Sequence, residues 1–89
     1  MTAERFFIVP GSLLESPVSG NAIKLYGILS FEGPCPSHAQ LARLSSLSAS
    51  TVKRKLAELE RFGAIEQEAR YGAEGERLSN RYTLIRGDA

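Results

Sequence analysis

Apolar side chains recur at spacings of three and four residues in three segments of the chain, a pattern typical of helices with one buried face. It predicts α-helices over residues 20–32, 38–44 and 49–61. The apolar positions of the first helix are Ala22, Leu25, Tyr26, Ile28, Leu29 and Phe31. Residues 33–36, which contain one glycine and two prolines, are expected to separate the first helix from the second.

A serine stands directly before each predicted helix, where its hydroxyl can accept a hydrogen bond from an N–H of the first turn. These serines are Ser19, Ser37 and Ser48. Gln40, three residues after Ser37, predicts a capping box at the start of the second helix. Gly63 is expected to end the third helix, because glycine readily adopts the left-handed conformation that follows a helix.

Shorter segments outside these helices predict strands over residues 5–9, 64–69 and 81–85. Pro10 ends the first strand, and a single helical turn is expected around Leu13 and Leu14. The last two strands are expected to pair as a hairpin with a long, flexible tip, since residues 70–80 contain two glycines and several charges. The elements together predict an α+β domain in the order strand, helix, helix, helix, strand, strand.

The third helix is expected to bury one side and to expose hydroxyl and guanidinium groups on the other. At about 100° per residue, the buried side consists of Ala49, Val52, Leu56 and Leu59. The opposite side consists of Ser50, Arg54 and Arg61 around the small Ala57, with Thr51 and Lys53 at its margins. Small residues would let the backbone approach a grooved partner while the long cations reach past them.

Composition restricts the possible classes of protein. A chain of 89 residues predicts one domain, residues 1–89. The single cysteine, Cys35, and the single histidine, His38, cannot supply the four ligands of a structural zinc site, and no metal or other cofactor is expected. His38 is expected to be exposed or capping, with a phosphate contact as the alternative.

No carboxylate pair, nucleophile–base set or phosphate-binding loop is found in the sequence, so an enzyme is not expected. No apolar run approaches the roughly 20 residues that a membrane-spanning helix needs. We therefore expect a cytoplasmic protein without a membrane partner.

The formal net charge is only +1, but the cations are unevenly distributed. Residues 37–62 contain five lysines and arginines against two glutamates, a local charge of +3. The five are Arg43, Lys53, Arg54, Lys55 and Arg61, and the hairpin region adds Arg70, Arg77 and Arg81. A helix face of this kind can simply be solvated, so the cluster indicates a nucleic-acid partner only together with the surrounding pattern.

The segment LARLSSLSASTV, residues 41–52, with KRKLAELERFGAI after it, resembles a winged helix-turn-helix DNA-binding domain. Ala42 occupies the position of a small packing residue, Leu47 the core position of the turn, and Val52 a core position of the second helix. Ser46 stands where the family usually has glycine, because the turn often needs a positive φ. The resemblance covers roughly residues 20–85 and implies three helices with a small β-sheet and a wing hairpin.

Two further segments, FFIVPGSLLES near the N-terminus and SNRYTL at residues 79–84, are similar to helix-turn-helix domains of plasmid and phage replication proteins. In that family an initial strand pairs with the wing hairpin, and the domain binds repeated sites at an origin. Similar domains occur in transcription regulators. The resemblance implies double-stranded DNA as the partner, bound by copies that pair on repeated sites or by one domain of a larger protein.

The resemblance also implies a role for individual residues. The third helix would enter the major groove, where Arg54 is the best candidate for a contact to guanine. Ser37 and Ser48 would meet phosphates, and the arginines of the wing would lie against the backbone or the minor groove. The expected DNA-binding residues are Ser37, Ser48, Ser50, Thr51, Lys53, Arg54, Lys55, Arg61, Arg70, Arg77 and Arg81.

Other roles remain open at this point. Asn80 is expected to shape the turn of the wing, and Tyr71 and Tyr82 are expected to pack rather than to stack on bases.

The alternative function is a winged-helix module that binds proteins and not DNA, and an exposed apolar patch would favour it. The candidates for such a patch are Leu13, Leu14 and Phe62.

Overall fold

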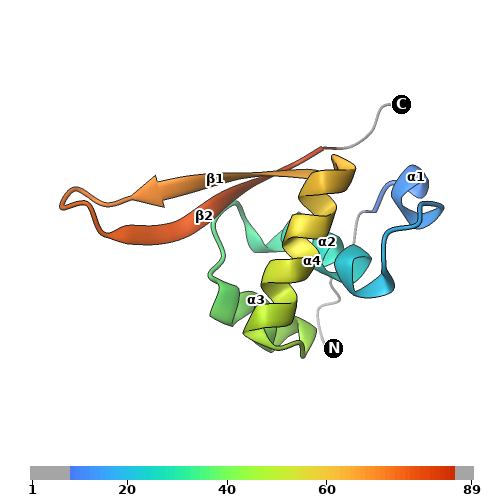
Figure 1. Ribbon diagram of the computed structural model, residues 1–89, viewed down its shortest axis with the longest axis horizontal. Helices are drawn as coiled ribbons and strands as arrows, with labels where there is room; N and C mark the ends of the chain where they lie inside the picture. The colour runs from blue at the N-terminus through green and yellow to red at the C-terminus, as the bar shows by residue number, and fades with distance from the viewer. Residues whose placement is uncertain (1–8, 86–89) are drawn as a thin grey trace, which may run out of the picture.

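The computed structural model describes residues 9–85, and within them four helices and one two-stranded antiparallel sheet. The elements are α1 (Gly11–Leu14), α2 (Gly20–Glu32), α3 (His38–Ser45), α4 (Ala49–Phe62), β1 (Ile65–Tyr71) and β2 (Arg77–Leu84). The helices gather into one body, and the β1–β2 hairpin projects from it as a long arm (Figure 1). The predicted α+β class is confirmed, whereas the strand predicted over residues 5–9 lies outside the described residues apart from Val9.

The three serines predicted to cap helices do so. The hydroxyls of Ser19, Ser37 and Ser48 each accept a hydrogen bond from the backbone N–H three residues later, at 3.0–3.3 Å. The side chain of Gln40, which was expected to complete a capping box, donates instead to Glu32 Oε1 at 2.7 Å. Gln40 therefore ties the start of α3 to the end of α2.

The hydrophobic core lies between α2, α3, α4 and the base of the hairpin. Val52, Leu56 and Leu59 on α4 are each at most 1% exposed, as the helical pattern predicts. Ala49, expected on the same side, is exposed together with its neighbours Ser48 and Ser50, because the first turn of α4 extends beyond the core.

Both α3 and α4 end in the same hydrogen-bonded motif. After α3, Leu47 N donates to the Ala42 carbonyl at 3.2 Å, and after α4, Ala64 N donates to the Leu59 carbonyl at 2.9 Å. This six-to-one bond is that of a Schellman motif, which places the intervening residue in the left-handed region. That residue is Gly63 after α4, with φ 92°, and Ser46 after α3, with φ 63°. Ser46 therefore adopts the positive φ that the resemblance associates with glycine at this position.

A lysine of α2 also holds the turn between α3 and α4. The Lys24 ammonium donates to the carbonyl oxygen of Ser45 at 2.8 Å. A cation at this end of a helix satisfies a free carbonyl and opposes the partial negative charge of the helix terminus. The angle between α3 and α4 is therefore fixed by Lys24 as well as by the left-handed turn.

The two strands of the hairpin are longer than predicted, and its tip is shorter. The strands extend to Tyr71 and from Arg77, so that only residues 72–76 form the tip. The register shifts between the pairs Glu68↔Arg81 and Arg70↔Leu78, which leaves one extra residue in β2, a β-bulge. Arg70 Nη1 donates to the carbonyl oxygen of Ser79 at this bulge at 3.0 Å, and so satisfies an acceptor beside the interrupted ladder.

Two hydrogen bonds connect the base of the hairpin to the rest of the domain. Tyr82 N donates to the carbonyl of Pro34, in the loop after α2, at 2.7 Å. The hydroxyl of Tyr26, a fully buried residue of α2, donates to the Ile85 carbonyl at 3.3 Å. A third bond, from Ile85 N to the Ala64 carbonyl at 2.8 Å, continues the pairing of the two strands. The first two contacts therefore restrict the direction in which the arm leaves the body.

Candidate nucleic-acid interface

The N-terminal half of α4 presents a polar surface to solvent. Ser50, Lys53 and Arg54 are exposed, whereas Val52 between them is fully buried. This is the arrangement that the helical pattern predicts, since residues two positions apart lie on nearly opposite sides of a helix. The groups that could contact a partner are thus free of the core.

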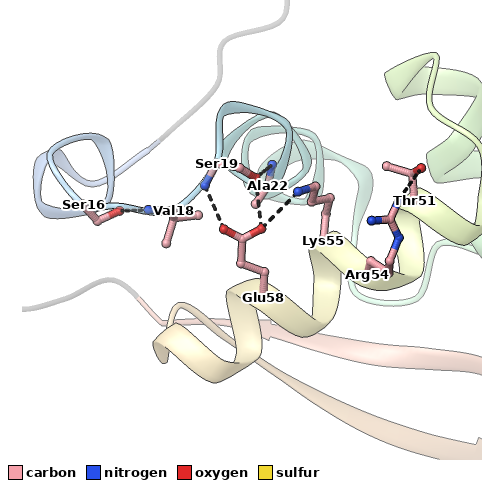
Figure 2. Close-up of polar contacts among 8 residues, drawn as sticks. All are labelled: Ser16, Val18, Ser19, Ala22, Thr51, Arg54, Lys55 and Glu58. Carbon is pink, nitrogen blue, oxygen red and sulfur yellow. Dashed lines mark hydrogen bonds and ion pairs between the residues drawn. The ribbon is translucent and has the colours of Figure 1, made fainter.

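The hydroxyls at the start of α4 form a cluster that includes the Arg54 guanidinium. Ser48 Oγ donates to Thr51 Oγ1 at 2.9 Å and lies 3.3 Å from Ser50 Oγ. Arg54 Nη2 donates to Thr51 Oγ1 at 3.2 Å, so that the arginine is turned back along the helix toward its N-terminal end (Figure 2). These bonds are exposed and can be exchanged for bonds to a ligand at little cost.

Glu58 links α4 to the start of α2. Its carboxylate accepts hydrogen bonds from Ser19 N at 2.8 Å and from Ser19 Oγ at 3.0 Å, and the Lys55 ammonium lies 3.4 Å away (Figure 2). The Ser19 backbone N–H is the main cause that lowers the pKa of Glu58, aided by the Ser19 hydroxyl and Lys55 and opposed by partial burial. Lys55, expected to contact DNA, therefore has an intramolecular partner.

The other carboxylate of α4 is directed toward the sheet. Glu60 Oε1 accepts a hydrogen bond from Gln67 Nε2 on β1 at 3.1 Å. Within residues 9–85, neither glutamate of α4 forms an ion pair with Lys53 or Arg54. The cations in the N-terminal half of the helix are therefore not neutralised by the acids of the same helix.

A hollow of about 290 Å³ lies between α3, α4 and the hairpin. It is lined by Pro36, His38, Lys53, Arg77, Leu78, Ser79 and Asn80, and we call it the α4–hairpin hollow. Four consecutive residues of β2 reach it, whereas successive side chains of a regular strand point to opposite faces. The β-bulge at this point explains the exception, because a bulge redirects the side chains around it.

Arg77 is held at the edge of the α4–hairpin hollow by several contacts. Its guanidinium donates to Asn80 Oδ1 at 2.6 Å and to the Leu78 carbonyl, and it lies 5.6 Å from the centre of the Tyr71 ring. Asn80 in turn donates to Gln67 Oε1 at 3.2 Å. Asn80 thus orients an arginine from within β2, and the expectation that it shapes the turn is wrong, since the turn lies at residues 72–76.

The two tyrosines of the hairpin differ in their surroundings. Tyr82 is 5% exposed and packs against the core, as expected, but Tyr71 is 64% exposed, so its expected packing role is wrong. His38 Nε2 lies 3.1 Å from the Tyr82 hydroxyl. Burial is the main cause that raises the pKa of Tyr82, so the phenol keeps its proton near neutral pH.

His38 is partly buried and lies among positive charges. Desolvation is the main cause that lowers the pKa of His38, and the charges of Lys53 and Arg77 lower it further. The imidazole is therefore mostly neutral at pH 7, because even its ordinary pKa of 6.5 lies below that pH. The sequence offered no signal for this, since its neighbours in space come from α4 and β2.

The remaining arginines of the predicted set are not among the residues that line this hollow. Arg70 is engaged with the Ser79 carbonyl, and Arg81 is exposed directly opposite Glu68. Arg61 is exposed near the far end of α4, about 16 Å along the axis from Ser50 by the rise of 1.5 Å per residue. Of the predicted set, the structure thus places Lys53 and Arg77 around one hollow, and it adds His38 to them.

The two capping serines that were expected to contact phosphates have only part of their hydrogen-bonding capacity available for a ligand. The hydroxyls of Ser37 and Ser48 already accept hydrogen bonds from the first turns of α3 and α4. Ser37 is half-buried, whereas Ser48 is exposed. Of the two, Ser48 is the one placed to meet a partner that approaches the start of α4.

A second, shallower hollow lies at the other end of α4. It is lined by Pro17, Val18, Glu58, Arg61 and Phe62. Phe62 is 46% exposed and Leu14 is 60% exposed, whereas Leu13 is buried. Of the three residues considered for an apolar patch, two are therefore uncovered.

Comparison with known proteins identifies no relative of this chain. The chain matches no protein-family model, and neither the curated proteins nor the solved structures give a significant match. In the described part of the chain, no helix combines the length and apolar character needed to cross a membrane. Over the same residues, no three His, Cys, Asp or Glu side chains group as metal ligands.

Proposed function

We propose that this chain is a winged helix-turn-helix domain that binds double-stranded DNA. In this proposal α3 and α4 are the two helices of the motif, α4 lies in the major groove, and the β1–β2 hairpin is the wing. The observation that carries the proposal is the exposed polar surface at the start of α4, where Lys53 and Arg54 form no ion pair with another residue of 9–85. An α-helix fits the major groove, and the residues near its N-terminus usually face the base edges.

Within the proposed interface, Arg54 reads a base and the other cations contact the backbone. Arg54 is exposed, and among residues 9–85 its hydrogen bond to Thr51 is the one that has to break before its guanidinium can extend. A guanidinium can donate two parallel hydrogen bonds to guanine O6 and N7. The left-handed turn at Ser46 and the Lys24 bond to Ser45 support the proposal, because they fix the angle at which α4 is presented.

The first test is binding of a random-sequence duplex, measured by fluorescence polarisation at increasing salt concentration. With about four to six phosphates contacted, the proposal predicts a slope of log K against log [salt] of about −4 to −5. Arg54→Ala should lose discrimination between a selected site and random DNA by about 1–3 kcal/mol. An absence of binding at low salt would count against the proposal, and equal loss on both DNAs would remove the base-reading role of Arg54.

The biological process in which the domain acts is inferred from the sequence resemblance alone. We propose replication initiation or transcription regulation, with copies that pair on repeated sites or with this domain as one part of a larger protein. Binding to a duplex with two copies of a selected site, at varied spacing, tests the first arrangement. Cooperative binding at one spacing supports pairing, and independent binding at every spacing excludes it.

A protein-interaction module is the second candidate, and the exposed Phe62 and Leu14 favour it. Failure of the wild type to bind duplex DNA at low salt would favour this second candidate. Replacing Phe62 by serine tests whether this exposed residue takes part in DNA binding. DNA binding should be unchanged by Phe62→Ser, since this residue lies at the end of α4 opposite to Ser50.

A further inference from the structure

The α4–hairpin hollow has the properties of an anion site. Two cations, Lys53 from α4 and Arg77 from β2, line it, and among residues 9–85 no carboxylate does so. Arg77 is already oriented by Asn80 and Leu78. A guanidinium carries five N–H donors, so these contacts leave others available for a ligand.

His38 adds a group whose charge can change. It is the only histidine of the chain, and it lines the same hollow as the two cations. Its contact with the Tyr82 hydroxyl at 3.1 Å suits both charge states, because a phenol can donate to a neutral imidazole or accept from a protonated one. The protonated form therefore needs no rearrangement of α3.

We propose that the α4–hairpin hollow binds one phosphate of the DNA backbone between Lys53 and Arg77, and that His38 takes up a proton when the phosphate enters. This inference rests on the proposed function, and it assigns Lys53 to the backbone and not to the base edges. Without a ligand, the two cations oppose protonation of His38. A phosphodiester brings one negative charge that offsets them, so the protonated imidazole becomes favourable in the complex.

The direction of the pH dependence follows from this coupling. Since the complex holds more protons than the free protein, lowering the pH strengthens binding. One proton can change the affinity by at most tenfold per pH unit. The charged and titratable groups around His38 are Lys53 on α4 and Arg77 and Tyr82 on β2. Cys35, in the loop before α3, lies near Tyr82.

The test measures the affinity for a random-sequence duplex between pH 5.5 and 8.0, for wild type and for His38→Gln. The wild type is expected to bind several-fold more tightly at pH 5.5 than at pH 8.0, beyond any change that His38→Gln shows. Arg43→Gln is a matched control, because Arg43 is an exposed cation of α3 that does not line the hollow. This variant should keep the wild-type pH dependence, whereas Lys53→Gln should reduce it.

A direct readout is available because the imidazole signals in an NMR spectrum belong to His38 alone. The pKa of His38, measured by pH titration, should rise when the duplex is added at saturation. An unchanged or lower pKa in the complex overturns the inference while leaving DNA binding intact. Equal pH dependence in wild type and His38→Gln does the same. Failure of the wild type to bind duplex DNA at any pH overturns both this inference and the proposed function.

Discussion

Ser46 is the single residue other than glycine with a positive φ in the described part of the chain, and replacing it with glycine should stabilise the domain. The left-handed conformation costs about 1–2 kcal/mol for a residue with a Cβ atom. Glycine avoids that cost but loses about 0.4–1 kcal/mol through the greater freedom of the unfolded chain. Ser46 is exposed, and no hydrogen bond of its side chain is found in residues 9–85, so no contact is lost. The net gain should be about 0.5–1 kcal/mol.

Gly63 provides the reciprocal control, since it occupies the same position in the same motif after α4. Its φ is 92°, and a Cβ atom added there would meet no atom within 4 Å. Gly63→Ser should therefore lose stability for conformational reasons alone, by about 1 kcal/mol.

Urea denaturation and thermal unfolding followed by circular dichroism measure both changes. In a domain of this size 1 kcal/mol corresponds to about 4–8 °C in Tm, so Ser46→Gly should raise Tm by about 2–8 °C. Stability equal to or below that of wild type in Ser46→Gly, with Gly63→Ser destabilised, would refute the argument that Ser46 is strained. Unchanged stability in both variants would refute the assigned turn geometry at both sites.

Three further predictions concern the body and the hairpin. Leu59→Ala should cost about 2–5 kcal/mol by the cavity it leaves in the core, whereas Ala49→Ser should be near neutral in the same denaturation assay. Glu58→Gln should lose about 1 kcal/mol of stability at pH 7. Because the pKa of Glu58 is lowered in the folded state, its stabilisation is present above the unfolded pKa of about 4.5 and is lost as the pH falls through the folded-state pKa. The stabilities of the wild type and Glu58→Gln should therefore converge in acid. Arg70→Gln should expose the Ser79 carbonyl and speed hydrogen exchange in the hairpin but not in α2, and uniform protection in both would contradict its role at the bulge.

The helices could be predicted because their signals are local. The capping serines, the apolar spacing and Gly63 each act within one or two turns, and the boundaries of α2 and α4 agree with the prediction to within one residue. The resemblance marked Ser46 as a departure from the glycine usual at this turn, and it left the conformation of the turn open. The structure shows a positive φ at Ser46, since the Schellman bond from Leu47 to Ala42 requires that conformation.

The site could be predicted only in part, because much of it depends on contacts between distant segments. The exposure of Arg54 follows from the helical period of α4 alone. Glu58 bonds to Ser19, which lies 39 residues away in the chain. The bulge in β2 depends on how two strands pair, and it places Arg77 beside Lys53 and His38. No periodicity along one segment indicates such an arrangement.

The central claim, that the exposed surface of α4 reads duplex DNA, is tested most directly by selecting bound duplexes from a random pool with the wild type and with Arg54→Ala. The account predicts that the wild type enriches one short motif containing a guanine, and that Arg54→Ala relaxes the preference at that guanine. A wild-type selection that enriches no motif, or an Arg54→Ala selection that returns the same motif with the same strength, would contradict it.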